Sequence, residues 1–293
     1  MISSLAFALL LATSPVDPTQ SINADPPIDA AHPASSLAAQ FKSHGATINA
    51  LIYRPAGAGL HPTVLLFHGL PGNEQNLDLA RALQRAGWTV VTFHYRGSWG
   101  SGGEFTLVGG DDDADALIEA LRDPKTASAW GVDPAHMVVV GHSYGGFIAA
   151  ATAARHPEIL ASVLIAPWDL SFDQRAWSKL TPQALAQTSA EGFDDVEGRL
   201  GGVTVASLTD DLLHHGASLD LAKLAPALAN RPVFILTATR DDPDDQAGDL
   251  IPALAAAHAA QVKIIRMDTD HPFNDRRIEL EADVVRWLAP FSH

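Results

Sequence analysis

The chain has 293 residues, of which 47% are hydrophobic and 18% are charged, a composition typical of a globular protein with a sizeable core. Its formal net charge of −15 argues against nucleic acids and anionic membranes as partners, because an acidic surface is repelled by both. The absence of cysteine excludes disulfides, thiolate metal sites and a cysteine nucleophile, and it leaves the cellular compartment open.

The chain begins with an apolar run over residues 1–12, which is too short to span a bilayer and about the length of a signal-peptide core. This run predicts export to the periplasm or the medium. No Lys or Arg precedes it and Pro15 follows it closely, so a cytoplasmic protein remains the alternative. Residues 14–33 are rich in Pro, Asp and Ala without periodicity, which indicates a disordered linker. We expect a leader over residues 1–35 and one folded domain over residues 36–293.

Strands and helices alternate along the predicted domain. One or two edge strands are expected over residues 37–49, and a further strand ends at Pro55. From there, apolar runs of strand length alternate with segments of helical periodicity. The predicted strands are residues 63–67, 89–94, 137–140, 160–165, 232–238 and 262–267, and the predicted helices are residues 76–86, 111–121, 146–155, 247–260 and 277–288. Such alternation indicates an α/β fold with a parallel sheet wrapped by helices.

The alternation is interrupted between residues 168 and 230, where the periodicity is weak. Several short helices fit this stretch, and the strand pattern resumes at residue 232. We interpret residues 168–230 as a cap-like insertion in the folded domain.

A candidate nucleophile lies in the sequence Gly141-His142-Ser143-Tyr144-Gly145, between the apolar run 137–140 and the predicted helix that follows. This is the strand–turn–helix setting of a G-x-S-x-G nucleophile elbow, in which Ser143 would attack. Glycines flank the serine because a Cβ at either position would collide with the neighbouring backbone in so sharp a turn. A tight turn that happens to contain a serine is the alternative interpretation.

A serine hydroxyl needs a base to take its proton and a carboxylate to orient that base. Loops at the carboxyl ends of parallel strands converge on one crevice, so both groups are expected after the last two strands. Asp241 follows the first of these strands and His271 follows the second, which gives the order Ser…Asp…His. Asp242 is adjacent and remains an alternative acid. A surface-loop histidine and a solvated acidic turn are the alternatives for the pair.

Two backbone amides are needed to stabilise the oxyanion that forms during acyl transfer. One is expected from Tyr144, directly after the serine, and the other from Leu70 in the loop of residues 68–72. A plain turn rich in Gly and Pro is the alternative for that loop. Trp99 lies in a glycine-rich loop that has no P-loop lysine, and we interpret it as a substrate contact at the rim of the site.

Two other polar clusters are not expected to bind a metal. Asp111, Asp112 and Asp113 precede residues 114–121 at the amino terminus of a predicted helix, where carboxylates are favoured as helix caps. His214 and His215 are consecutive and would point apart on a helix, which favours a surface position over a metal site.

With these loops in this order, the chain resembles the α/β-hydrolase superfamily over residues 40–290. Tyr95-Arg96-Gly97, the elbow sequence and Asp270-His271 are most similar to dienelactone-hydrolase-like esterases and to the catalytic domains of prolyl-oligopeptidase-type serine peptidases. The resemblance implies an eight-stranded, mostly parallel sheet with helices on both faces, a serine nucleophile and no cofactor. The family's acid loop usually reads Gly-x-x-Asp. Ala238 replaces that glycine here, and the spacing favours Asp241.

The leading hypothesis is therefore a serine hydrolase that cleaves a carboxylic ester, or a related acyl bond, of a small-molecule substrate. An aminopeptidase is the first alternative, because the acidic residues of the insertion could attract a substrate amine; these are Glu191, Asp194, Asp195 and Glu197. A solvated acidic face explains them equally well. A non-catalytic binding module on the same fold is the second alternative.

Overall fold

The structure, a computed structural model, describes residues 19–241 and 247–292. Within these residues, eight strands form one sheet in the order β1-β2-β4-β3-β5-β6-β7-β8. The strands are β1 (Ser35–Ser43), β2 (Ala46–Arg54), β3 (His61–Phe67), β4 (Thr89–Phe93), β5 (Val132–His142), β6 (Ile159–Ile165), β7 (Val233–Ala238) and β8 (Val262–Met267). Strand β2 pairs antiparallel with β1 and β4, and the remaining neighbours are parallel. The predicted fold class is confirmed.

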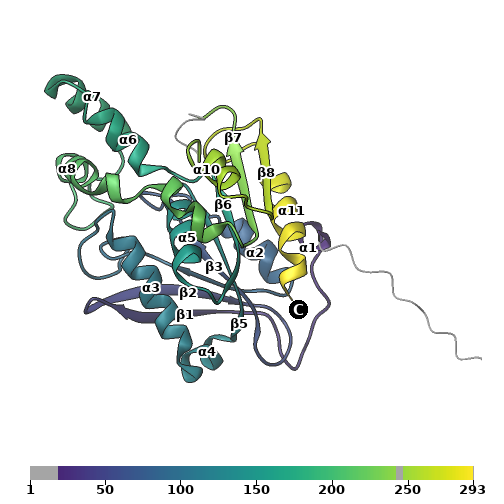
Figure 1. Cartoon of the computed structure of the whole chain (residues 1–293). Helices are drawn as coiled ribbons and strands as arrows, with labels where there is room; N and C mark the ends of the chain where they lie inside the picture. Colours follow the sequence, from purple (N-terminus) through teal and green to yellow (C-terminus); the bar gives the residue numbers. More distant parts are fainter. Residues whose placement is uncertain (1–18, 242–246, 293) are drawn as a thin grey trace, which may run out of the picture.

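Helices cover both faces of the sheet (Figure 1). One face packs against α3, α4, α5 and α10, and the other packs against α2 and α11. The bounds of these helices are α2 (Leu77–Arg85), α3 (Gly109–Arg122), α4 (Pro124–Trp130), α5 (Tyr144–Arg155), α10 (Leu250–Ala256) and α11 (Arg277–Leu288), the last followed by η3 (Ala289–Phe291). Strand β7 is buried along its whole length, as its continuous apolar sequence requires for a strand covered on both faces.

The segment between β6 and β7 is helical. It contains α6 (Leu170–Trp177), α7 (Pro182–Gly192), α8 (Val205–His215), η1 (Gly216–Ser218), η2 (Leu221–Leu224) and α9 (Ala225–Leu228). Figure 1 shows α6, α7 and α8 together at one end of the molecule, away from α4. The loop between α7 and α8 contacts the loop that follows β4, where Gly201 N donates a hydrogen bond to Gly97 O over 2.5 Å.

Several elements differ from the sequence-based expectations. Helix α4 was not predicted, although Asp123 caps its first turn and Gly131 ends it with a positive φ. Helix α10 is shorter than residues 247–260. The predicted linker is wrong in part, because the short helix α1 (Gln20–Asn23) packs against α2, where Arg85 donates a hydrogen bond to Ser21 O.

The apolar run that predicted export lies outside the described residues. No helix of the described part is long and apolar enough to cross a membrane.

Candidate active site

Ser143 lies at the turn between β5 and α5, in a strained backbone conformation. Its φ is 56° and its ψ is −122°, a combination that side-chain-bearing residues adopt only when their surroundings enforce it. Backbone hydrogen bonds hold it there: Ser143 N donates to Ile165 O over 2.9 Å, and Ser143 O accepts from Gly146 N and Trp168 N over 2.8 Å and 3.0 Å. The turn leaves the serine side chain partly accessible at the carboxyl end of the sheet.

The glycines around Ser143 are required by close backbone contacts. A Cβ on Gly141 would overlap the carbonyl of Gly145, and a Cβ on Gly145 would overlap the carbonyl of Phe67. A Cβ on Gly146 would lie 2.7 Å from the Cα of Pro167. The expectation that side chains at the flanking positions would collide with backbone is confirmed, and it explains why the sharp turn needs these residues.

Asp241 and His271 follow β7 and β8 and are brought together by the pairing of these strands. The loops continue the strand register, since Thr239 N donates to Met267 O over 2.9 Å. His271 Nδ1 donates a hydrogen bond to Asp241 Oδ2, and both side chains are partly exposed. A proton on Nδ1 leaves the lone pair of His271 Nε2 free to accept another proton. The alternative acid, Asp242, lies outside the described residues.

His142 joins the elbow to the loop that carries His271, and sequence reasoning had assigned it no role. Its Nε2 donates a hydrogen bond to His271 O over 2.9 Å, and the two rings lie 4.8 Å apart between centroids. Burial lowers the pKa of His142 to about 3, so the ring stays neutral near pH 7. In the described part of the chain, Ser143 Oγ has no hydrogen bond to His271, and such bonds often tighten only when substrate binds.

The loop of residues 68–72 packs against the elbow. A Cβ on Gly69 would lie 3.0 Å from the Cβ of Ser143, so the loop backbone and the serine are in direct contact. The half-buried Leu70 follows, and its amide belongs to the backbone that lies against the serine. The imidazole of His68 is buried beneath the loop, which lowers its pKa to about 4, and its Nδ1 donates to Gly69 O over 2.7 Å.

Tyr144 begins α5, so its amide lies next to Ser143. The tyrosine side chain points away from the turn into the core, where its hydroxyl donates to Leu107 O over 2.7 Å. Only the backbone of Tyr144 is therefore available to a substrate at the elbow.

Trp99 lies on the rim loop, which we define as residues 95–103. It is 42% exposed and has a φ of 45°. The rim loop and the loop between α7 and α8 border an open hollow of about 530 Å³, lined by Gly97, Trp99, Gly100, Ser101, Gly103, Gly198, Arg199, Leu200 and Gly201. The lining residues include one aromatic side chain, that of Trp99, one guanidinium, that of Arg199, and several glycines.

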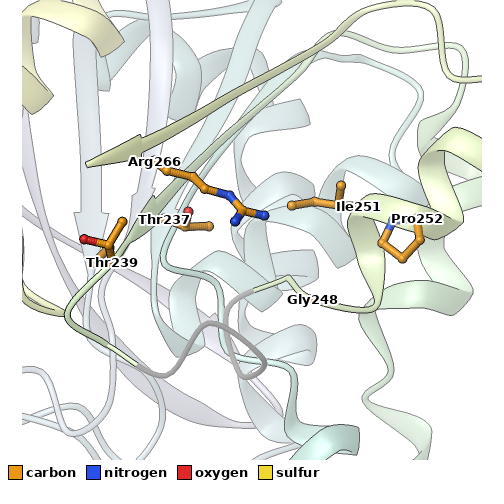
Figure 2. Close-up of a pocket in the computed structure, with 7 residues that line it drawn as sticks. Thr237, Thr239, Gly248, Ile251, Pro252 and Arg266 are labelled. Atoms are coloured by element: carbon orange, nitrogen blue, oxygen red, sulfur yellow. The ribbon is translucent and has the colours of Figure 1, made fainter. Parts of the chain in front are cut away.

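A second pocket of about 280 Å³ lies between β7 and α10 (Figure 2). Figure 2 shows the guanidinium of Arg266 reaching from β8 toward Ile251 of α10. Thr239, at the start of the Asp241 loop, lines the same pocket. Among the described residues that line it, none is Ser143, Asp241 or His271.

Neither polar cluster forms a metal site in the residues that the structure describes. His214 and His215 are exposed in the last turn of α8. The aspartates were predicted to cap a helix. Asp111 and Asp112 do lie in the first turn of α3, but the N-cap residue is Val108 and no side chain caps the helix. Asp113 is buried instead, because its carboxylate accepts hydrogen bonds from Arg96 and Ser43.

Comparison with known proteins gives one family. The alpha/beta hydrolase fold family matches residues 62–256. The uncharacterized peptidase YuxL of Bacillus subtilis (strain 168) is 28% identical over 247 residues, which cover 76% of this chain and 33% of YuxL. The chain spans less than half the length of the curated relatives it matches.

Solved structures share the same architecture. A 2,6-dihydroxy-pseudo-oxynicotine hydrolase superposes with a TM-score of 0.65 at 18% identity, over 89% of this chain and 69% of that one. The carboxylesterase EstE1, cloned from a metagenomic library, superposes with a TM-score of 0.61 at 21% identity, over 94% of both chains. At these identities the likeness demonstrates the fold alone.

Proposed function

The chain is a hydrolase of the α/β-hydrolase fold family, and we propose that it is a serine esterase that works through an acyl-enzyme on Ser143. The observation that carries the proposal is the hydrogen-bonded pair His271–Asp241, attached through His142 to a strained elbow serine. A base oriented by a carboxylate next to an accessible hydroxyl is the arrangement that nucleophilic acyl transfer requires.

In the proposed reaction, Ser143 Oγ attacks the ester carbonyl carbon while His271 Nε2 takes the hydroxyl proton. Asp241 stabilises the imidazolium that forms, and the amides of Tyr144 and Leu70 bind the oxyanion. The intermediate collapses when His271 returns the proton to the leaving alcohol, which leaves an ester on Ser143. Water then attacks this ester with His271 as base, and the carboxylic acid leaves with the serine regenerated.

The contacts of the acidic residues in the insertion favour an ester over an aminoacyl substrate, because most of these carboxylates accept hydrogen bonds from other residues of the protein. Glu191 accepts a hydrogen bond from Gln187 within α7, and Glu197 accepts from Val205 N at the start of α8. Asp195 accepts from Asn73, just beyond the 68–72 loop. These three carboxylates have partners within the protein and the fourth, Asp194, is exposed, so a substrate amine is not needed to explain them. Aminoacyl arylamides assayed beside p-nitrophenyl esters separate the two activities, and faster arylamide cleavage would favour the peptidase.

Labelling with a fluorophosphonate probe and peptide mapping tests the proposal without a known substrate. The expected adduct is on Ser143 and is lost in His271→Ala. Ser143→Ala should abolish ester turnover, and Asp241→Asn should lower kcat by about 10³-fold to 10⁴-fold, because the imidazole loses its orienting carboxylate. Asp268→Asn removes an exposed carboxylate from the same loop as His271 and serves as the matched control.

The outcomes separate the alternatives. An equally large loss in Asp242→Asn, with Asp241→Asn active, would assign the acid to the neighbouring residue. Well-folded protein with no adduct on Ser143 would contradict the esterase and favour a binding module.

A further inference from the structure

Two side chains of the rim loop bind carbonyl groups on either side of Leu70. The hydroxyl of Tyr95 donates to His68 O over 3.0 Å, and the indole Nε1 of Trp99 donates to Pro71 O over 2.7 Å. Between them, His68 Nδ1 donates to Gly69 O. The Gly69 carbonyl and the Leu70 amide share one planar peptide unit, so fixing the carbonyl also fixes the direction of the N–H.

The position of Trp99 is enforced by its own backbone and by Gly72. A φ of 45° is an unfavourable value for a large side chain, and such conformations persist where the surroundings hold them. A Cβ on Gly72 would lie 2.6 Å from Trp99 Nε1 and 2.8 Å from His68 Cε1. The glycine thus leaves the space through which the indole reaches the loop.

The rim loop is itself anchored in the core. Tyr95 is fully buried, with its ring 5.2 Å from Phe93 and 5.3 Å from Tyr144 between centroids. Arg96 donates to the buried carboxylate of Asp113 from its backbone N and its Nε, over 2.8 Å and 2.7 Å. Both hydrogen-bond donors are therefore carried by a segment that cannot shift without breaking buried contacts.

We propose that Tyr95 and Trp99 are positioning residues that hold the Leu70 amide ready for the oxyanion. The inference rests on the proposed esterase function. Donors that are fixed before reaction stabilise a developing charge without reorganising, so loosening the loop costs transition-state binding more than substrate binding. The buried hydroxyl of Tyr95 cannot touch a substrate, and this separates positioning from substrate contact.

Tyr95→Phe and Trp99→Phe test the inference, because each removes one donor and keeps an aromatic ring. With p-nitrophenyl butyrate, each should lower kcat by about tenfold to about a hundredfold while KM stays within about twofold. Affinity for an alkyl trifluoromethyl ketone, whose adduct with serine carries an oxyanion, should fall by a similar factor. The midpoint of the pH–rate profile should not move, since neither residue contacts His271. Trp287→Phe, on α11, is the control.

Unfolding midpoints measured on every variant distinguish a loosened loop from a damaged fold. Wild-type kcat in both Tyr95→Phe and Trp99→Phe would overturn the inference, and so would a rise in KM alone in Trp99→Phe, which would make the indole only a substrate contact. Absence of a fluorophosphonate adduct on wild-type Ser143 would overturn the proposed function, and the inference with it.

Discussion

Replacing His142 with glutamine is expected to change how the stability of the fold depends on pH. Burial lowers the pKa of this histidine from 6.5 to about 3. Below about pH 6.5 the unfolded chain therefore binds a proton that the folded chain takes up only near pH 3. As the pH is lowered through this window, the free energy of unfolding decreases, because the unfolded state binds more protons than the folded state.

The size of the effect follows from the shift. One pKa unit corresponds to about 1.36 kcal/mol, so the 1.5 units between 6.5 and pH 5 remove about 2 kcal/mol of stability. Glutamine cannot be protonated in this range, and its amide keeps a donor for His271 O. The variant should therefore lack this pH-dependent loss and retain the contact to the His271 loop.

Urea unfolding followed by tryptophan fluorescence, at pH 7 and pH 5, measures the difference. Wild-type protein should lose about 2 kcal/mol more than His142→Gln between these two values, while titrations common to both proteins cancel. His214→Gln is the control, because that histidine is exposed on the surface of α8 and is not buried as His142 is. If the free energies of unfolding of wild type and His142→Gln differed by the same amount at pH 7 and at pH 5, the reasoning would be refuted.

Two further predictions concern stability. Gly145→Ala should lower the free energy of unfolding, measured in urea, by more than about 2 kcal/mol, because the new Cβ would overlap the Phe67 carbonyl. Gly102→Ala is the control, since a Cβ there would make only ordinary van der Waals contacts, and equal effects of the two substitutions would contradict the packing argument. Arg96→Met should cost about 3–5 kcal/mol, because the buried Asp113 carboxylate loses its guanidinium partner and keeps only the hydrogen bonds from Ser43 and from the backbone N of residue 96. Adding Asp113→Asn to Arg96→Met should recover part of the lost stability, measured as the midpoint temperature of unfolding. No recovery would show that the buried Asp113 charge is not the cause of the loss.

Much of the architecture was predictable because it follows from local patterns. Apolar runs bounded by turns marked the strands, and helical periodicity marked α11 at its observed bounds. The elbow was also visible in the sequence, because its glycines are required by close contacts within the same turn and with the neighbouring strand. Helix α4 was missed even though its capping signals were present.

The candidate site depended on tertiary structure wherever its residues are far apart in the chain. His142 contacts His271 across 129 positions, and Asp113 contacts Ser43 across 70. The register of β7 on β8 brings the ends of the two strands together, and this pairing places Asp241 against His271.

The sequence by itself determined the order of the elements, the turn that carries Ser143 and the two loops that carry Asp241 and His271. Only the tertiary structure decided that Tyr95 and Trp99 hold the 68–72 loop and that Asp113 is an ion-pair partner and not a helix cap. The physical reason is that periodicity and turn chemistry act over a few residues. Side-chain hydrogen bonds between loops form only after strand pairing and core packing have brought distant segments together.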